Sequence, residues 1–275
     1  LDTSVIRTTS TAGNASGQIG LRASGPGSTI TGTSTQVAMA PGGTSTPANM
    51  RGVSAEGGGS ISLTDAQIQV RGGTNALNNY GVQALGTGSS VILTRGTVDT
   101  LSRGAFGVLA LDGGRATLNG TQITTGGAQN AATLDGSHAI VARGSGSEVT
   151  GDEVTATTSG TLANLVRADN GGAVTLTSSH LLHTGPGNAA APAAAVRVLA
   201  GGSFILEGSD VTTRGALHSP GILVDGTDSQ ATISGSTIAV GGARSIGVWA
   251  LGGSAVTLAG TVVRQAPEAT TGPWH

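Results

Sequence analysis

Short runs in which hydrophobic and polar residues alternate recur along almost the whole chain. Segments of the pattern G-V-x-A-x-G-G-x-x-V-T-L-x-G-T-x-V begin at Gly52, Gly81, Gly107, Ala139, Leu165, Ala195, Gly221 and Gly247, and a weaker copy begins at Gly20. Successive copies start 26 to 32 residues apart. Self-similarity at such a period is typical of a solenoid, in which each repeat forms one turn.

Each repeat contains three short runs with the alternation of a β-strand. Alternate side chains of a strand point to the same face, so equivalent aliphatic residues form a column along one wall. The first run supplies the columns Leu21, Val53, Val82, Val108, Ile140, Val166, Val196, Ile222, Val248 and Ala23, Ala55, Ala84, Ala110, Ala142, Ala168, Val198, Val224, Ala250. The second run supplies Ile30, Ile61, Val91, Ala116, Val149, Val174, Phe204, Ala231, Val256, with Leu63, Leu93, Leu118, Leu176, Leu206, Ile233 and Leu258 two residues later. The third run supplies Ile68, Val98, Ile123, Val154, Leu181, Val211, Ile238 and Val263.

These columns predict an all-β fold, a single-stranded right-handed parallel β-helix (solenoid) of about nine turns with three sheets around one core. The right hand is expected because crossovers between parallel strands almost always have it. We expect residues 1–275 to form one continuous β-helix, with an irregular C-terminal segment at residues 264–275, where the pattern is lost. Neither end has a polar capping turn, which indicates a fragment of a longer protein.

Glycines punctuate the corners between the predicted strands. The first corner carries the pairs Gly113-Gly114, Gly171-Gly172, Gly201-Gly202 and Gly252-Gly253, and the second corner carries Gly96, Gly120, Gly208, Gly235 and Gly260. Tight corners need a positive φ, which glycine adopts without steric cost. The repeat length varies after the third strand, so loops such as 126–137 and 185–194 should project from the rod.

The composition excludes several classes of protein. All 13 basic residues are arginine, and with 15 acidic residues the net charge is only -2. This balance offers no basic field for a nucleic acid. The absence of cysteine excludes disulfides and thiolate metal sites. No apolar run approaches the roughly 20 residues that cross a bilayer as a helix.

Two repeats carry a family resemblance. Residues 107–123 (GVLALDGGRATLNGTQI) and 247–263 (GVWALGGSAVTLAGTVV) resemble turns of the pertactin-like passenger domains of Gram-negative autotransporters, which use type V secretion. The likeness extends from about Gly20 to Val263 and concerns repeat style. It implies a virulence-related rod at the bacterial cell surface, associated with the outer membrane only through a C-terminal barrel that is missing here. It also implies a host-cell component, a matrix component or another copy of the rod as partner.

Clustered reactive side chains would indicate an enzyme, because many parallel β-helices cleave acidic polysaccharides with grouped carboxylates. Here Glu56, Asp112, Asp169 and Asp225 occupy similar corners on separate turns, and we expect most acids to form turns and solubilise the surface. His180 and His183 should point to opposite faces of one strand, and His138, His218 and His275 read as surface or loop residues. The sequence therefore predicts no catalytic residue, no cofactor site and no metal site.

A row of apolar residues interleaves with the inward columns of the first strand, so it should face away from the core. It consists of Leu85, Leu109, Leu111, Leu199, Leu223, Trp249 and Leu251. Either the long loops fold back over this row, or it forms a contact stripe for a partner or a second rod, as contiguous exposed apolar surface does.

The outward side of the second strand is a ladder rich in threonine, which loosely resembles ice-binding solenoids. Its members are Thr31, Ser62, Ile92, Thr117, Thr150, Thr175, Ile205, Thr232 and Thr257, but threonine is also a common solvent-facing strand residue. We therefore predict a non-enzymatic, surface-exposed scaffold that acts in adhesion or self-association through its faces and loops. The alternatives are a β-helix polysaccharide lyase or hydrolase, a carbohydrate binder and, less favoured, an ice-binding solenoid.

Overall fold

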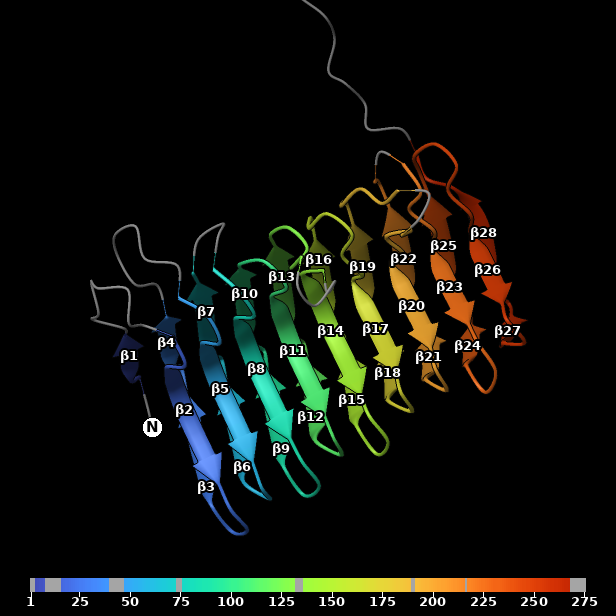
Figure 1. Ribbon diagram of the computed structural model, residues 1–275. Helices are drawn as coiled ribbons and strands as arrows, with labels where there is room; N and C mark the ends of the chain where they lie inside the picture. Colours follow the sequence, from blue (N-terminus) through green and yellow to red (C-terminus); the bar gives the residue numbers. More distant parts are fainter. Residues whose placement is uncertain are drawn as a thin grey trace, which may run out of the picture.

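The chain winds into a rod of stacked turns, each built from three short strands (Figure 1). The computed structural model describes residues 3–7, 16–39, 47–72, 76–131, 136–188, 191–215 and 217–267, and no helix occurs among them. Every strand pairs in parallel with its equivalent in each neighbouring turn, and the first and last strands of each sheet have one such neighbour. The predicted right-handed parallel β-helix is confirmed.

Three parallel sheets run along the rod, and we number them by the order of their strands within a turn, starting from β2. Sheet 1 contains β2 (Ile19–Ser24), β5 (Arg51–Glu56), β8 (Tyr80–Leu85), β11 (Phe106–Leu111), β14 (His138–Arg143), β17 (Val166–Asp169), β20 (Val196–Leu199), β23 (Ile222–Asp225) and β26 (Val248–Leu251). Sheet 2 contains β3 (Thr29–Thr33), β6 (Ser60–Thr64), β9 (Ser90–Thr94), β12 (Arg115–Asn119), β15 (Glu148–Asp152), β18 (Ala173–Thr177), β21 (Ser203–Glu207), β24 (Gln230–Ser234) and β27 (Ala255–Ala259). Sheet 3 contains β1 (Val5–Arg7), β4 (Gln36–Met39), β7 (Gln67–Arg71), β10 (Thr97–Leu101), β13 (Gln122–Gly126), β16 (Thr155–Thr158), β19 (His180–His183), β22 (Asp210–Thr213), β25 (Thr237–Val240) and β28 (Val262–Gln265).

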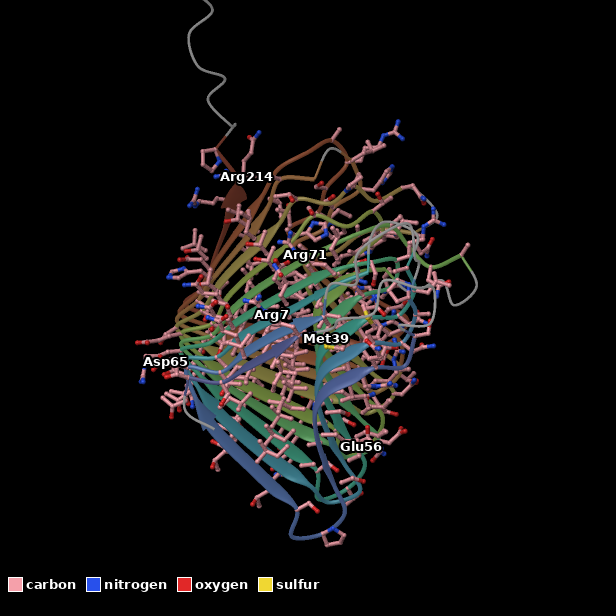
Figure 2. The ribbon with its side chains drawn as sticks, turned by 90° about the vertical axis from the view of Figure 1, so that its left-hand side faces the viewer. Arg7, Met39, Glu56, Asp65, Arg71 and Arg214 are labelled. Carbon is pink, nitrogen blue, oxygen red and sulfur yellow. The ribbon has the colours of Figure 1, made fainter. Side chains whose placement is uncertain are left out.

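The predicted columns are the walls of one continuous hydrophobic core. Val108, for example, pairs in register with Val82 and Ile140, and all three side chains are buried. Figure 2, with the N-terminal end toward the viewer, shows Met39 inside the outline of the three sheets and Glu56 and Asp65 outside it. In the last turn the columns keep their register, but Leu258 and Val263 are each 46% exposed.

The column predicted from the third run of each repeat differs from the structure at one position. Ala156, and not Val154, pairs with Ile123 and Leu181 in sheet 3. Val154 lies at the corner before β16 and is fully buried. A Cβ built at Gly151 would stand only 2.7 Å from a methyl of Val154, so the valine fills the space that this glycine leaves in the leucine column of sheet 2.

The glycine pairs of the first corner provide a positive φ, as predicted, and also allow neighbouring turns to approach closely. Gly113 has a φ of +91°, as expected for a tight corner. Gly114 has no positive φ, but a Cβ there would stand 2.1 Å from the carbonyl oxygen of Ala84 in the turn below. The second glycine therefore permits close stacking of neighbouring turns.

The second corner relies on glycine less than predicted. Its positive-φ position is occupied by Arg95 rather than Gly96, and by Glu153 and Ser178 in later turns. Near the C-terminus, the predicted irregular segment 264–275 begins too early, because Arg264 and Gln265 belong to β28. The rest of that segment from residue 268 lies outside the described residues.

Candidate binding surface

The outer side of sheet 3 carries mostly polar side chains along the rod, and we call it the open face. Its first column is Val5, Gln36, Gln67, Thr97, Gln122, Thr155, His180, Asp210, Thr237 and Val262. Its second column is Arg7, Ala38, Gln69, Asp99, Thr124, Thr157, Leu182, Thr212, Ala239 and Arg264. Most of the first column is exposed, whereas most of the second is half-buried, so the face is recessed along its middle.

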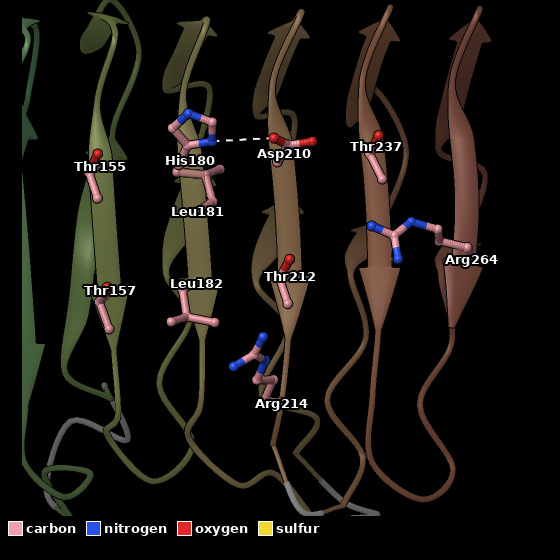
Figure 3. Close-up of a pocket in the computed structure, with 10 residues that line it drawn as sticks. All are labelled: Thr155, Thr157, His180, Leu181, Leu182, Asp210, Thr212, Arg214, Thr237 and Arg264. Atoms are coloured by element: carbon pink, nitrogen blue, oxygen red, sulfur yellow. Dashed lines mark ion pairs between the residues drawn. The ribbon is translucent and has the colours of Figure 1, made fainter. Parts of the chain in front are cut away.

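Shallow hollows mark both ends of the open face. One of about 400 Å³ extends over β1, β4, β7 and β10, between Arg7 and Asp99. Another of about 450 Å³, the C-terminal hollow, extends from Thr155 on β16 to Arg264 on β28 (Figure 3). A third of about 380 Å³ adjoins it at Arg214 and Gln265.

The C-terminal hollow combines hydroxyl groups, a histidine–aspartate pair and two arginines. His180 Nδ1 lies 3.3 Å from a carboxylate oxygen of Asp210 on the next strand. Figure 3 shows Arg264 reaching from β28 over β25, and Arg214 reaching from the end of β22 toward β19. Within the described part of the chain, neither arginine has an acidic partner. The hollow has no signal in the sequence, because its residues alternate as in any solvent-facing strand.

The apolar row predicted as a contact stripe lies on the outer side of sheet 1, which we call the closed face. Leu109 and Leu223 are only 2% exposed, so they offer no exposed contact surface. Leu109 belongs to a small outer cluster with Phe106 and Val141, against which Leu111 packs. The remaining members of the row are half-buried: Leu85, Leu111, Leu199, Trp249 and Leu251. Of the two alternatives for this row, exposure is therefore excluded for Leu109 and Leu223.

An aromatic stack covers part of the closed face. The rings of Tyr80 and Phe106 stack with centroids 5.0 Å apart, and His138 stacks on Phe106 at 5.4 Å. The guanidinium groups of Arg51 and Arg143 lie 5.7 Å from the Tyr80 and Phe106 ring centroids, respectively. His138 was expected on the surface or in a loop, but it is buried because its ring continues this stack from turn to turn.

Buried charges continue the closed face toward the C-terminus. Asp169 is almost completely buried and accepts hydrogen bonds from Arg143 Nε at 3.1 Å and from Arg167 Nε at 2.6 Å. His138 accepts a bond from the Asn164 backbone N–H at 2.8 Å. Burial lowers the pKa of His138 well below its usual value, and the charges of Arg167 and Arg143 lower it further. The ring is therefore neutral at pH 7.

Several acidic residues pair with arginines of a neighbouring turn. The pairs outside the buried network are Arg22–Glu56, Arg71–Asp99, Arg95–Asp65 and Arg115–Glu148. Such pairs link successive turns, a role of these acids that the sequence pattern does not predict. Among the described residues, no group of three or more histidine, aspartate or glutamate side chains could hold a metal ion.

The two histidines of β19 point in opposite directions, as predicted. His180 is exposed on the open face, whereas His183 is buried in the interior. His183 Nε2 lies 3.0 Å from the carbonyl oxygen of Ala163, to which it can donate a hydrogen bond. Burial lowers the pKa of His183 to about 4.

The outer side of sheet 2 is the predicted ladder of threonine, serine and isoleucine. Thr117, Thr150 and Thr175 lie in register on successive turns, and the hydroxyls of Thr150 and Thr117 are 3.3 Å apart. The ladder is interrupted by Ile92, which is 37% exposed, and by Ile205. This face therefore has no uninterrupted array of hydroxyl groups.

Comparisons with known proteins assign this chain to no family. No protein-family model and no curated protein matches the sequence. A similar solved structure is a fragment of TibA that is hyper-glycosylated in a TibC-catalysed reaction, with 18% identity, 96% coverage of this chain, 98% coverage of that chain and a TM-score of 0.21. At these values the likeness carries no argument about activity. The fold itself places the chain among the right-handed parallel β-helix proteins. No helix in the described residues is long and apolar enough to cross a membrane.

Proposed function

We propose that this protein is a non-enzymatic, autotransporter-passenger-like rod that acts in adhesion or self-association at a bacterial cell surface. The observation that carries the proposal is the open face, a mostly polar surface that follows the whole ten-stranded sheet and is hollowed toward both ends. Its partner would be a host-cell or matrix component, or a second copy of the rod. The proposal involves no cofactor and no nucleic acid.

The architecture suits a rod that presents a binding surface. Each turn contacts its neighbours through backbone hydrogen bonds on three sides, so the repeats stack into an extended scaffold with regularly spaced outer positions. The core is uniform from Leu21 to Ile238, and several acidic residues hold neighbouring turns together through arginine pairs. These features give the acids a structural use and leave binding to the outer columns.

Surface display tests the adhesive role directly. The chain would be displayed on Gram-negative cells through a heterologous anchor, and adherence to epithelial cells and cell–cell aggregation would be counted. We expect one or both to increase relative to cells that carry the anchor alone. Displayed protein that produces neither would contradict the proposal, and so would cleavage of any member of a polysaccharide panel by the purified chain.

A matched pair of variants assigns the activity to one face. Thr155→Glu with Thr237→Glu adds two negative charges to the open face within the C-terminal hollow. Thr31→Glu with Thr232→Glu makes the same change in charge at exposed positions of sheet 2. We expect the first pair to lower adherence several-fold and the second to leave it unchanged. Equal loss in both would remove the open face from the proposal.

A further inference from the structure

The C-terminal hollow of the open face has a composition that points to one class of ligand. We propose that it binds an anionic polysaccharide, a chain of sugar rings that carry carboxylate or sulfate groups, laid along the rod from β16 to β28. This inference rests on the proposed function, since it names the chemistry that the open face would recognise.

Two unpaired cations supply the preference for negative charge. Arg214 and Arg264 are exposed, project over neighbouring strands of the hollow, and have no acidic partner in the described part of the chain. A guanidinium group matches a carboxylate or a sulfate through two parallel N–H donors. Asp210 is the acidic residue that lines the hollow. The hollow as a whole therefore has a positive formal charge when His180 is neutral.

The opposite end of the same face shows why this feature is specific. In the N-terminal half, Arg71 Nε donates a 3.0 Å hydrogen bond to Asp99, so this guanidinium is neutralised within the protein. The two halves share one sheet and the same alternation, but among the described residues only the C-terminal hollow is lined by two arginines that have no acidic partner there. An anionic ligand should therefore prefer the C-terminal half.

The remaining lining groups suit the hydroxyls of a sugar. Thr155, Thr157, Thr212 and Thr237 place hydroxyl groups on three of the five strands, and Asp210 adds a strong acceptor. Successive strands lie about 4.8 Å apart, which is close to the advance per ring of an extended glycan. Each ring of a chain along the rod would thus meet a new row of side chains, over about 20 Å in total.

One strand crosses the hollow with an ordered series of groups. Asp210, Thr212 and Arg214 follow one another at alternate positions around β22, so a carboxylate, a hydroxyl and a guanidinium cross the groove. A sugar acid has hydroxyls on one part of its ring and its anionic group on another, which matches this order. Leu182, on the neighbouring strand, offers a half-buried apolar contact for the C–H face of a ring.

An extended peptide fits this surface less well. Peptides that add to a sheet use the free backbone groups of an edge strand. Here β16, β19, β22 and β25 are each paired on both sides, so four of the five strands of the hollow present side chains alone, and β28, the last strand of the sheet in the described chain, has the free edge. Recognition through side-chain hydroxyls and charges favours a polymer that itself carries many hydroxyls. An acidic peptide is nevertheless the alternative that the experiment must include.

The test is titration calorimetry of the intact chain with defined oligosaccharides. The probes are a galacturonate oligomer for carboxylates, a carrageenan oligomer for sulfates, a maltose-series oligomer of equal length as the neutral control, and a glutamate oligomer as the acidic peptide. We expect binding of one or both anionic glycans that weakens as salt rises, with no binding of the neutral oligomer. The two glycans distinguish the carboxylate from the sulfate source.

Variants locate the site on the rod. Arg264→Gln and Arg214→Gln should each weaken the binding of the anionic glycan about tenfold, the usual result of losing a hydrogen bond to a charged group. Arg7→Gln removes the same charge from an exposed position at the other end of the open face and should change binding less than twofold. All three side chains are exposed, so circular dichroism and thermal melting should show that each variant folds as the parent does.

The outcomes separate this inference from the proposed function. Failure to bind either anionic glycan, equal binding of the neutral or peptide probe, or an equal effect of Arg7→Gln would each overturn the anionic-glycan site. If displayed cells still adhere in that case, the proposed function stands and only the ligand class falls. If the glycan binds with the expected variant pattern but displayed cells do not adhere, the site stands and the adhesive role falls.

Discussion

The closed face and the open face are built from the same alternation of inward and outward residues, but they use the outward positions differently. On the closed face, Tyr80, Phe106 and His138 stack across successive turns, and Asp169 binds two arginines while almost completely buried. On the open face, the corresponding columns are glutamines, threonines and single charges that remain in contact with solvent.

The outward side chains of a solenoid can therefore either hold neighbouring turns together or remain available to bind a ligand. Groups that satisfy one another across turns, as on the closed face, have little capacity left for a partner. A few closed-face atoms still lack hydrogen-bond partners in the described chain, such as Arg197 Nε. The unpaired arginines of the C-terminal hollow, by contrast, are exposed and keep their hydrogen-bonding capacity for a ligand.

The largest expected effect comes from an inward position that both faces depend on. Val196→Asp places a charge in the fully buried column of sheet 1 and should lower the free energy of unfolding by more than about 4 kcal/mol, because nothing there can solvate it. Thr157→Asp, on the open face, should change it by less than about 0.5 kcal/mol. Urea denaturation measures both, and a mild effect of Val196→Asp would contradict the assignment of the core.

A second pair of variants compares a buried charge with an exposed one. Asp169→Ala leaves Arg143 and Arg167 without their shared carboxylate and should cost about 3–5 kcal/mol, as removing one partner of a buried pair does. Asp99→Ala breaks the Arg71 pair on the open face, where the side chains are 49% and 28% exposed, and should cost less than about 1 kcal/mol. Similar costs in urea denaturation would erase the energetic distinction between the two faces.

Acid should destabilise the fold through its buried histidines. The folded pKa of His183 is about 4 and its unfolded pKa about 6.5, so the unfolded chain binds the proton more readily between these values. The stability that the neutral ring contributes is present above pH 6.5 and is lost as the pH falls to about 4, by at most about 3 kcal/mol. The lowered pKa of His138 acts in the same direction.

Replacing the interior histidine checks this pH dependence. His183→Thr matches its register neighbours Thr158 and Thr213, so the variant should fit the column and fold at pH 8. Between pH 6.5 and 4 it should lose less stability than the parent chain in urea denaturation. Parallel curves for the two proteins over this range would show that His183 does not contribute.

The smallest expected effect concerns the corner that borders the open face. Ser178 has a φ of +48°, a conformation that is costly for any residue with a Cβ. Ser178→Gly should raise the free energy of unfolding by up to about 1 kcal/mol, after the greater backbone entropy of glycine is subtracted. Gly208→Ser, at the equivalent position of the next turn, should have the opposite sign, because its φ is +53° and no atom lies within 4 Å of a Cβ there.

The fold follows from the amino-acid pattern alone, because an inward residue must be apolar and the strand period of two then repeats in every turn. The columns through Val108, Ile61 and Val211 specified three sheets, their register and the continuous core. The same pattern also separated His180 from His183 correctly, since three positions along a strand reverse the face.

The burial and the pairing of the outward side chains, in contrast, depend on the tertiary structure. Leu109 and His138 occupy outward positions of their strands, where solvent exposure is expected. Both are nevertheless buried, because residues 26 or more positions apart in the chain stack across turns. Likewise, no local pattern shows that Arg71 pairs with Asp99 while Arg264 and Arg214 have no acidic partner within the described residues. Outward positions have no common core to satisfy, so their environment depends on which side chains the neighbouring turns bring beside them.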